Sequence, residues 1–278
     1  AARALRDFLL PAEGAVAVLV GAGISTDSRI PDYRGPHGVY RRNPTFKPIQ
    51  YHEFVAQHAR RQRYWSGSFL GWNYLRSRQP NATHLHLASL ERRGLTRALI
   101  TQNVDGLHRN ALPVIELHGA LRTLSCLTCK QTYDRDAWQR RLALLNPAVA
   151  DWARRFPDDQ PDVASSVNPD GDVEIRGNLD QFQYPACDHC TRAAPNVVFF
   201  GENIDPLIRD AATQAVERAK RLLVVGTSLQ VYSSFRLVKL AKSRGMPVAI
   251  VNLGETRGDS LADLRLHAPS SALLDELA

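Results

Sequence analysis

The four cysteines of this chain form two pairs with the same spacing, Cys126-x-x-Cys129 and Cys187-x-x-Cys190. Two close thiolate pairs can complete a tetrahedron around Zn²⁺, and four cysteine ligands leave no open position for water. The pattern therefore predicts one structural zinc ion per chain. Two redox motifs or plain core cysteines are the alternatives, whereas a secreted disulfide framework needs more cysteines in a less regular pattern. The long spacer 130–186 predicts an insertion between the pairs.

A glycine turn follows a valine-rich apolar run near the start of the chain. The run 15–20 leads directly into Gly21-Ala22-Gly23. Glycines let the backbone approach a pyrophosphate, and the helix that follows offers its first amides. The segment therefore indicates a phosphate-binding turn for a dinucleotide. Thr26 replaces the third glycine of the usual fingerprint, so a tight turn without a ligand is the alternative.

Three more polar segments come directly after apolar runs. Thr101–His108 concentrates amide, carboxylate and imidazole groups, Gly226–Leu229 offers backbone amides and hydroxyls, and Asn252 could reach a ribose. Open α/β sheets bind ligands at the carboxyl ends of their strands. The segments therefore predict a common site, with simple strand-terminating turns as the alternative.

A histidine on a predicted loop comes ten residues after the polar segment Thr101–His108, and glycine follows it. His118 lies between Glu116-Leu117 and Gly119. An accessible imidazole titrates near neutral pH and can exchange protons there. His118 is therefore a candidate general base, and a hydrogen-bonded structural histidine is the alternative.

These segments need a parallel sheet to bring them together. Short apolar runs predict buried strands, and helix-like stretches between some of them predict an α/β fold. The expected strands are 15–20, 98–101, 196–200, 222–225 and 248–251, and two of the expected helices are 206–221 and 234–244.

Two stretches interrupt this alternation of strands and helices. Residues 36–94 are rich in aromatic residues and arginine and are predicted to be mostly helical. Residues 121–190 contain all four cysteines. Within them, Phe156–Asp172 is dense in Pro, Asp, Ser and Gly, which predicts a long surface loop.

The composition is that of a protein with a sizeable core and no membrane span. The chain has 278 residues, of which 44% are hydrophobic, and no apolar run approaches the length of about 20 residues that crosses a bilayer. Its net charge of +7 comes from scattered arginines. A solvated basic surface is therefore favoured over a nucleic-acid patch. The arginine excess is typical of a GC-rich bacterial genome, which would place the protein in the cytoplasm.

Taken in order, these segments resemble the sirtuin family over nearly the whole chain. The motifs that carry the resemblance are GAGIS at 21–25, IPDYR at 30–34, TQNVD at 101–105, LHG at 117–119, the two cysteine pairs, VVFFGE at 197–202, GTSLQV at 226–231 and VNLG at 251–254.

The resemblance implies a zinc-containing, NAD-dependent protein lysine deacylase, a transferase that releases nicotinamide and O-acyl-ADP-ribose. It implies a Rossmann-like parallel sheet built from residues 1–35, 95–120 and 191–278. A helical module at 36–94 and a zinc-ribbon module with a long inserted loop at 121–190 would be inserted in it. NAD and an acyl-lysine peptide or protein would bind between these parts.

The resemblance also assigns the site residues. His118 would be the general base that takes a proton from a ribose hydroxyl, and Asn103 a second catalytic residue. Zinc would bind Cys126, Cys129, Cys187 and Cys190, and the acyl-lysine substrate would contact Val198, Phe199, Phe200 and Gly201. The expected NAD-binding residues are Gly21, Ala22, Gly23, Thr26, Ile30, Asp32, Tyr33, Arg34, Gln102, Asn103, Asp105, Gly226, Thr227, Ser228, Asn252, Leu253, Gly254 and Ser270.

Within the family the chain is most similar to class II, in the branch that includes mitochondrial sirtuin four. The residues behind this are RQRYW at 61–65, GTSLQVYS at 226–233, NLGETR at 252–257 and NPDGDV at 168–173. This branch makes the mitochondrial matrix the alternative location.

Two departures bear on specificity. Arg29 stands where the family usually has glycine. Trp65 and Ser68 stand where a succinyl-preferring relative has tyrosine and arginine. A carboxylate clamp is therefore missing, and dicarboxylic acyl groups cannot be assigned by analogy.

Other functions remain open at this stage. Within the enzyme class they are ADP-ribosyl transfer, removal of a longer acyl chain such as lipoyl, and hydride transfer, which the missing third glycine disfavours. A zinc-ribbon binding module without activity is the alternative of another class. The insertion at 146–182 is either a flap at the acyl channel or a loop without a role, and the oligomeric state is not assigned.

Overall fold

The computed structural model of the chain describes residues 1–12, 14–109, 114–154, 167–173, 181–190 and 193–277. In this part of the chain no helix is both long enough and apolar enough to cross a membrane.

A six-stranded sheet forms one half of the molecule, and all its strands are parallel. Its order is β3-β2-β1-β7-β8-β9. The register places Val20 beside both Thr101 and Val225, so three strands end at the same edge. The strands are β1 Val16–Val20, β2 Ala98–Thr101, β3 Val114–Glu116, β7 Arg221–Val225, β8 Val248–Val251 and β9 Leu264–Leu266.

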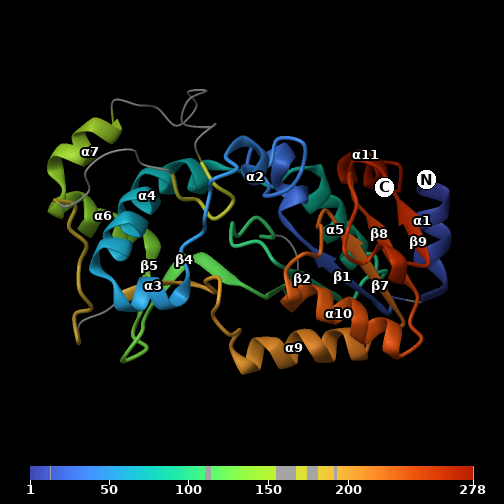
Figure 1. Ribbon diagram of the computed structural model, residues 1–278. Helices are drawn as coiled ribbons and strands as arrows, with labels where there is room; N and C mark the ends of the chain where they lie inside the picture. Colours follow the sequence, from blue (N-terminus) through green and yellow to red (C-terminus); the bar gives the residue numbers. More distant parts are fainter. Residues whose placement is uncertain (13, 110–113, 155–166, 174–180, 191–192, 278) are drawn as a thin grey trace.

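Helices cover both faces of this sheet, which explains why its strands read as continuous apolar runs. Alternate residues of β1 point to opposite faces, with Val18 in one buried cluster and Leu19 in the other. Figure 1 shows α9 and α10 on one side of the sheet and α5 and α11 on the other. The covering helices are α1 Ala2–Leu9, α5 Ala82–Arg92 and α11 Ser270–Asp275 on one face, and α9 Pro206–Glu217 and α10 Tyr232–Ser243 on the other.

A second sheet has three antiparallel strands in the order β5-β4-β6. They are β4 Gly119–Cys126, β5 Thr132–Asp134 and β6 Ala193–Val197. The run predicted as a strand at 196–200 was therefore misplaced: the strand ends at Val197 and pairs with β4, not with the parallel sheet. The reason is that the chain leaves the parallel sheet along β4 and returns along β6, so the two segments run side by side in opposite directions.

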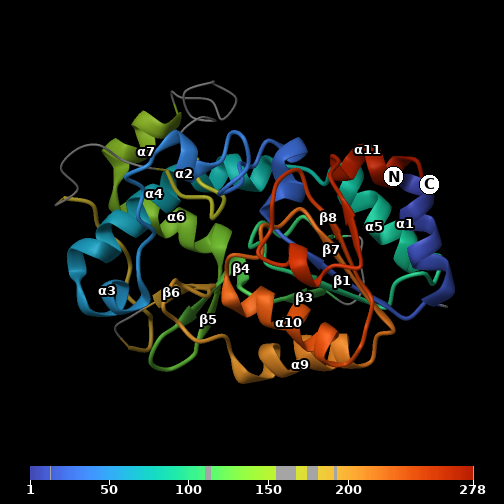
Figure 2. The ribbon, with the colours of Figure 1, turned by 45° about the vertical axis from the view of Figure 1, so that its right-hand side comes forward.

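The helical and zinc-binding parts share one buried cluster. Phe54 and Trp65 of the first pack with Trp138 and Leu142 of the second. Figure 2 shows these helices gathered at the end of the molecule away from α1 and α11. The helices are α2 Val39–Arg42, α3 Tyr51–Ala56, α4 His58–Ser77, α6 Arg135–Leu145 and α7 Pro147–Arg154.

The proposed module boundaries stay a prediction. Helix α5 lies within 36–94, but its Leu87 and Leu90 belong to the cluster under the parallel sheet. Short 3-10 helices complete the fold: η1 Leu10–Ala12, η2 Ala22–Ser28 and η3 Asp259–Leu261.

Part of the predicted surface loop is a buried turn. Residues 156–166 lie outside the described part, but Val167 and Val173 form an antiparallel bridge, and Val167 is fully buried. The backbone of the turn Val167–Val173 packs closely on α4 because that helix has glycines at two positions one turn apart, Gly67 and Gly71. A Cβ at Gly71 would overlap the carbonyl oxygen of Gly171, and one at Gly67 would lie 2.7 Å from the oxygen of Val173.

A buried histidine pair links α5 to the loop after β2. The rings of His84 and His108 have centroids 4.8 Å apart, and His84 is only 3% exposed. Burial lowers the pKa of His84 to about 3, with a further contribution from His108, and burial lowers the pKa of His108 to about 4. Both imidazoles are therefore neutral in the folded protein at neutral pH.

This pair predicts a stability loss in acid. Unfolded histidine titrates near pH 6.5. The contribution of each neutral ring is therefore complete above that pH and is lost as the pH falls toward 4, by up to about 1.4 kcal/mol per pH unit and group. Urea unfolding between pH 7 and 5 should show a shallower loss in His108→Gln than in the wild type. The same change at the exposed His37 is the control. Equal slopes in His108→Gln and the wild type would contradict the prediction.

Candidate functional site

A cavity of about 1450 Å³ lies between the carboxyl edge of the parallel sheet and the two inserted parts. Of the residues predicted to bind NAD or substrate or to act in catalysis, only Gly21 does not line it. Those on the cavity wall are Ala22, Gly23, Thr26, Ile30, Asp32, Tyr33, Arg34, Gln102, Asn103, Asp105, His118, Val198, Phe199, Phe200, Gly201, Gly226, Thr227, Ser228, Asn252, Leu253, Gly254 and Ser270.

Two glycine turns meet at this edge. The amide of Gly23 donates to the carbonyl oxygen of Gly226 over 2.9 Å. A Cβ on Gly23 would lie 2.8 Å from that oxygen, and Gly226 has a φ of +61° with its own Cβ position 2.7 Å from the amide nitrogen of Ile24. Side chains are excluded on both sides, so backbone forms this part of the wall. Gly21 supports it from behind, where its Cβ position meets the side chain of Thr227.

A chain of polar groups forms the cavity floor. The side-chain amide of Asn103 donates to the carbonyl of Gly21 and to the hydroxyl of Ser25, at 3.2 and 3.1 Å. Ser25 in turn donates to a carboxylate oxygen of Asp105 over 2.7 Å. Burial raises the pKa of Asp105, while the hydrogen bonds from Leu107 and Ser25 oppose that shift. The network fixes three polar side chains that would otherwise be free to rotate.

His118 is held by hydrogen bonds at both ring nitrogens. Its Nδ1 lies 3.0 Å from the carbonyl oxygen of Gln102, and its Nε2 lies 2.8 Å from the hydroxyl of Ser233. A carbonyl can only accept, so Nδ1 carries the proton and Nε2 holds the lone pair. Burial lowers the pKa of His118, and the bond to Gln102 opposes the shift. A neutral imidazole with its basic nitrogen in the cavity can accept a proton there.

The segment 198–201 connects the base to the inserted modules. The amide of Val198 donates to the carbonyl of His118 over 2.9 Å, and Tyr51 donates to the carbonyl of Phe200 over the same distance. The ring of Phe199 stacks on Phe54 with centroids 4.7 Å apart. The segment therefore spans the gap between the parallel sheet and α3.

The turn Val167–Val173 forms another part of the wall. Its Asn168 donates to the carboxylate of Asp172 over 2.6 Å, and Asp170 also lines the cavity. Burial raises the pKa of both carboxyl groups. This acidic pair lies in the half of the cavity that α4 and Tyr33 border.

Two more of the predicted NAD contacts also bond to other residues of the protein. The side chain of Asn252 donates to the carbonyl of Gly254 over 2.8 Å, and the hydroxyl of Ser270 bonds that of Thr83 over 3.0 Å. Both side chains therefore have intramolecular hydrogen-bond partners. Arg29 has a φ of 63°, the left-handed region that favours glycine, which explains why a glycine is usual at that position.

The sequence analysis missed Ser25 and Ser233. Ser25 is part of the GAGIS motif, which was the only signal for it. Ser233 lies in the first turn of α10, and its role depends on a contact with a residue far away in the sequence.

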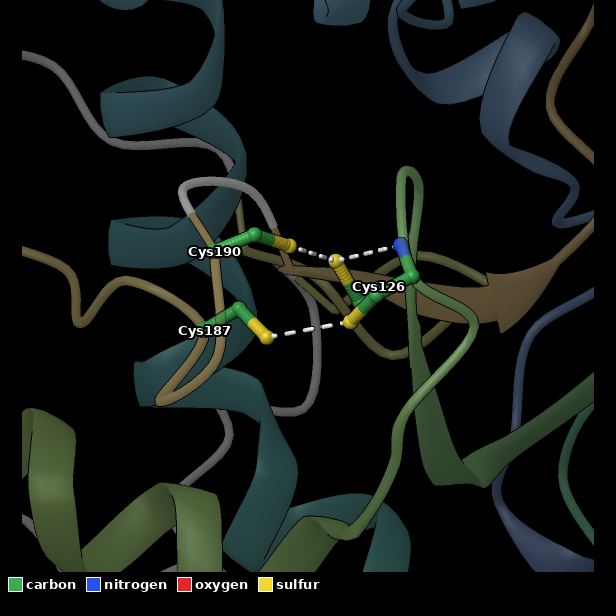
Figure 3. A group of neighbouring side chains, drawn as sticks. Cys126, Cys187 and Cys190 are labelled. Carbon is green, nitrogen blue, oxygen red and sulfur yellow. Dashed lines mark hydrogen bonds between the residues drawn. The ribbon is translucent and has the colours of Figure 1, made fainter.

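The four cysteines come together as predicted. Their sulfur atoms all lie within 4.8 Å of one another, and Figure 3 shows those of Cys126, Cys187 and Cys190 pointing toward a common centre. A tetrahedron of zinc–sulfur bonds of about 2.3 Å places its sulfur atoms about 3.8 Å apart, so the cluster is compact enough to hold the ion. The amides of Thr128 and His189 lie 3.4 and 3.5 Å from the sulfurs of Cys126 and Cys187. The residues fit a structural zinc ion with no open position.

A family model described as the Sir2 family matches residues 21–233. The chain belongs to the Sir2 family. It is 53% identical to the NAD-dependent protein deacylase SIR4 of Batrachochytrium dendrobatidis, over 99% of this chain and 92% of that protein. It is 42% identical to the NAD-dependent protein lipoamidase sirtuin-4, mitochondrial, of Bos taurus, over 92% of this chain and 79% of that protein.

Solved structures of the family agree with the fold. One that contains Sir2, a p53 peptide and NAD⁺ superposes with a TM-score of 0.74 at 29% identity, covering all of this chain and 97% of that one. The sirtuin fold with its Rossmann-like sheet is therefore confirmed.

A bacterial relative is also similar in sequence. The NAD-dependent protein deacetylase 3 of Pseudomonas syringae is 44% identical over 96% of this chain and 92% of that protein.

The zinc site predicts a linked loss of metal and stability. Cys187→Ser should release zinc and lower the melting temperature by about 5 °C or more, because structural zinc binding is also folding free energy. Zinc content and thermal unfolding measure both quantities. Thr128→Ala changes an exposed side chain in the same turn and should keep the metal. Full zinc occupancy in Cys187→Ser would show that this thiolate is not a ligand.

Proposed function

We propose that this chain is an NAD-dependent protein lysine deacylase that releases nicotinamide and O-acyl-ADP-ribose. The observation that carries the proposal is His118, a neutral imidazole whose Nε2 lone pair faces a cavity walled by two glycine turns. A base of this kind suits proton removal from a hydroxyl near neutral pH. The match of residues 21–233 to the Sir2 family model supports the same NAD-dependent deacylation.

The glycine turns at 21–23 and 226–228 suit the pyrophosphate and the adenosine half. Backbone amides there can approach an anion without a side chain in between. NAD supplies the ADP-ribosyl group that receives the acyl chain as nicotinamide leaves. Asn103 and Asp105, on the cavity floor, orient the ribose and the nicotinamide carboxamide of NAD. Ser25 keeps both side chains in place through its hydrogen bonds to them. His118 accepts the proton of a ribose hydroxyl at Nε2, and its Nδ1 stays bonded to Gln102 throughout.

The acyl-lysine segment of a protein or peptide enters between the parallel sheet and the inserted modules. Segment 198–201 has Phe199 fixed against Phe54 and supplies the wall there. Binding the amide of the acyl-lysine next to the ribose provides much of the rate increase over the uncatalysed reaction. The solved relative that contains a p53 peptide and NAD⁺ supports a peptide substrate.

The buried turn Val167–Val173 would border the acyl chain. Its residues 168–170, 172 and 173 line the cavity, and its backbone packs on the glycines of α4. Removal of a long acyl chain such as lipoyl is the second candidate activity. It is supported by the size of the cavity and by the lipoamidase among the relatives.

For the location of the protein we propose the cytoplasm of a bacterium or the mitochondrial matrix. Both a bacterial and a mitochondrial relative match the chain.

The base makes a direct prediction. His118→Gln keeps a side chain of similar reach but cannot take up the proton, so deacylation should fall by about 10²-fold or more. NAD affinity should change little, because no phosphate or adenosine contact is assigned to His118. Nicotinamide release with an acetyl-lysine peptide measures the first quantity, and calorimetric titration with NAD the second. Near-normal turnover would remove His118 from the mechanism.

The glycine contact of α4 predicts a change in acyl preference. Gly71→Ala pushes a methyl group into the carbonyl of Gly171 and should displace the turn Val167–Val173. The ratio of kcat/KM for lipoyl and acetyl peptides should change by about tenfold, some 1.4 kcal/mol in transition-state binding. The KM for NAD should stay the same.

Asn73→Ala on the exposed side of the same helix is the matched control. Replacing an exposed asparagine by alanine raises helix propensity without touching the turn, so this variant should keep the wild-type ratio. An unchanged ratio in Gly71→Ala would leave the turn without a part in acyl selection.

A further inference from the structure

The basic nitrogen of His118 already has a hydroxyl partner within the protein. Ser233 lies in the first turn of α10, and its Oγ is 2.8 Å from Nε2 of His118. Because Nδ1 carries the ring proton, the hydroxyl of Ser233 must be the donor in this bond. The neighbouring Ser234 differs: it is buried, and its hydroxyl donates to the carbonyl of Val231 over 2.9 Å.

The arrangement matches the requirements for an activated serine. A serine becomes nucleophilic when its hydroxyl bonds a general base that a third group holds in orientation. Here the third group is the carbonyl of Gln102, 3.0 Å from Nδ1. Ser233 is half-buried and lines the large cavity, so a substrate carbonyl can approach its oxygen. Burial also keeps His118 neutral, because it lowers the pKa of the ring.

We propose that Ser233 is a second nucleophile of this site, which accepts acyl groups from activated esters when no NAD is bound. The base that would deprotonate a ribose hydroxyl then serves the hydroxyl of Ser233 instead. The substrate class is aryl esters or thioesters whose acyl chain fits the cavity.

The reaction balances with water as the only co-reactant. The Oγ of Ser233 attacks the ester carbonyl carbon while its proton moves to Nε2 of His118. The bond to the leaving oxygen or sulfur then breaks, and His118 returns the proton to that atom. Water next attacks the acyl-serine, gives its proton to His118 and releases the acid, after which His118 reprotonates Ser233. The net reaction is ester hydrolysis.

The start of α10 supports the negative charge that develops on the carbonyl oxygen. The first amides of a helix have no carbonyl of the same helix to bond, and Ser233 is the second residue of this 12-residue helix. Donors aimed at such an oxygen stabilise the transition state.

The test uses the 278-residue chain with its zinc bound. The substrates are p-nitrophenyl acetate and p-nitrophenyl hexanoate, in the absence of NAD. We expect a burst of about one p-nitrophenolate per chain, the sign of an accumulating acyl-enzyme. Mass spectrometry of the tryptic peptide 222–236 should place the acyl group on Ser233 and not on Ser234. Saturating NAD should suppress the burst, because the ribose hydroxyl takes the place of Ser233 at Nε2.

Variants separate the proposal from other sources of a burst. Ser233→Ala should lose both burst and label, and Ser234→Ala should keep them. Ser233→Cys should give a label that hydroxylamine removes, which keeps the test informative if the alanine variant does not fold. A full burst in folded Ser233→Ala, or a label on a cysteine or lysine elsewhere, would overturn the proposal.

The outcome is independent of the proposed deacylase function. That function is measured as nicotinamide released in the presence of NAD and an acyl-lysine peptide. An enzyme that releases nicotinamide but shows no burst overturns only the role of Ser233. One that shows the burst but releases no nicotinamide overturns only the deacylase assignment.

Discussion

The close approach of two backbones, at Gly23 and Gly226, is the constraint on which the site depends. A hydrogen bond joins the turns that leave β1 and β7, and a side chain on either glycine would separate them. Because the central strands end in register at this edge, the turns leave a cavity wall made of backbone. A wall of this kind lets an anionic group come close to the backbone, because no side chain lies in between. The polar floor of Asn103, Ser25 and Asp105 is anchored to the same turn through the carbonyl of Gly21.

His118 lies where the parallel sheet gives way to the small antiparallel one. Its ring is held by a carbonyl at the end of β2 and by a hydroxyl at the start of α10, and its own carbonyl accepts from the segment that follows β6. Three parts of the chain therefore set the tautomer and position of one base. This arrangement fits a site in which different hydroxyl groups compete for one nitrogen, from the cofactor ribose or from Ser233.

The helical and zinc-binding parts of the chain pack together through one buried cluster. Trp65 of α4 and Trp138 of α6 belong to the same buried cluster, and the zinc ligands fix the end of β4 that leads into it. The turn Val167–Val173 then reaches back over α4 to the cavity, which places Asp170 and Asp172 in its wall. A metal site without an open position for water has a structural role, which is to hold this part of the chain in place.

The sequence by itself determined the parts whose signal is local. Each of these signals lies within a few residues: glycine turns after apolar runs, paired cysteines and a histidine before glycine. Their order along the chain indicates the family and the parallel sheet. The three-residue strands β3 and β9 were not predicted, because so short a segment shows no periodicity. The apolar run 196–200 was assigned to the wrong sheet for a similar reason, since an apolar run does not say which neighbour it will pair with. Only the tertiary structure brought Ser233 to His118, 115 positions apart, and Gly171 to Gly71. Such contacts depend on how helices and modules pack, and a single sequence carries no signal for the distance between two residues that are far apart along the chain.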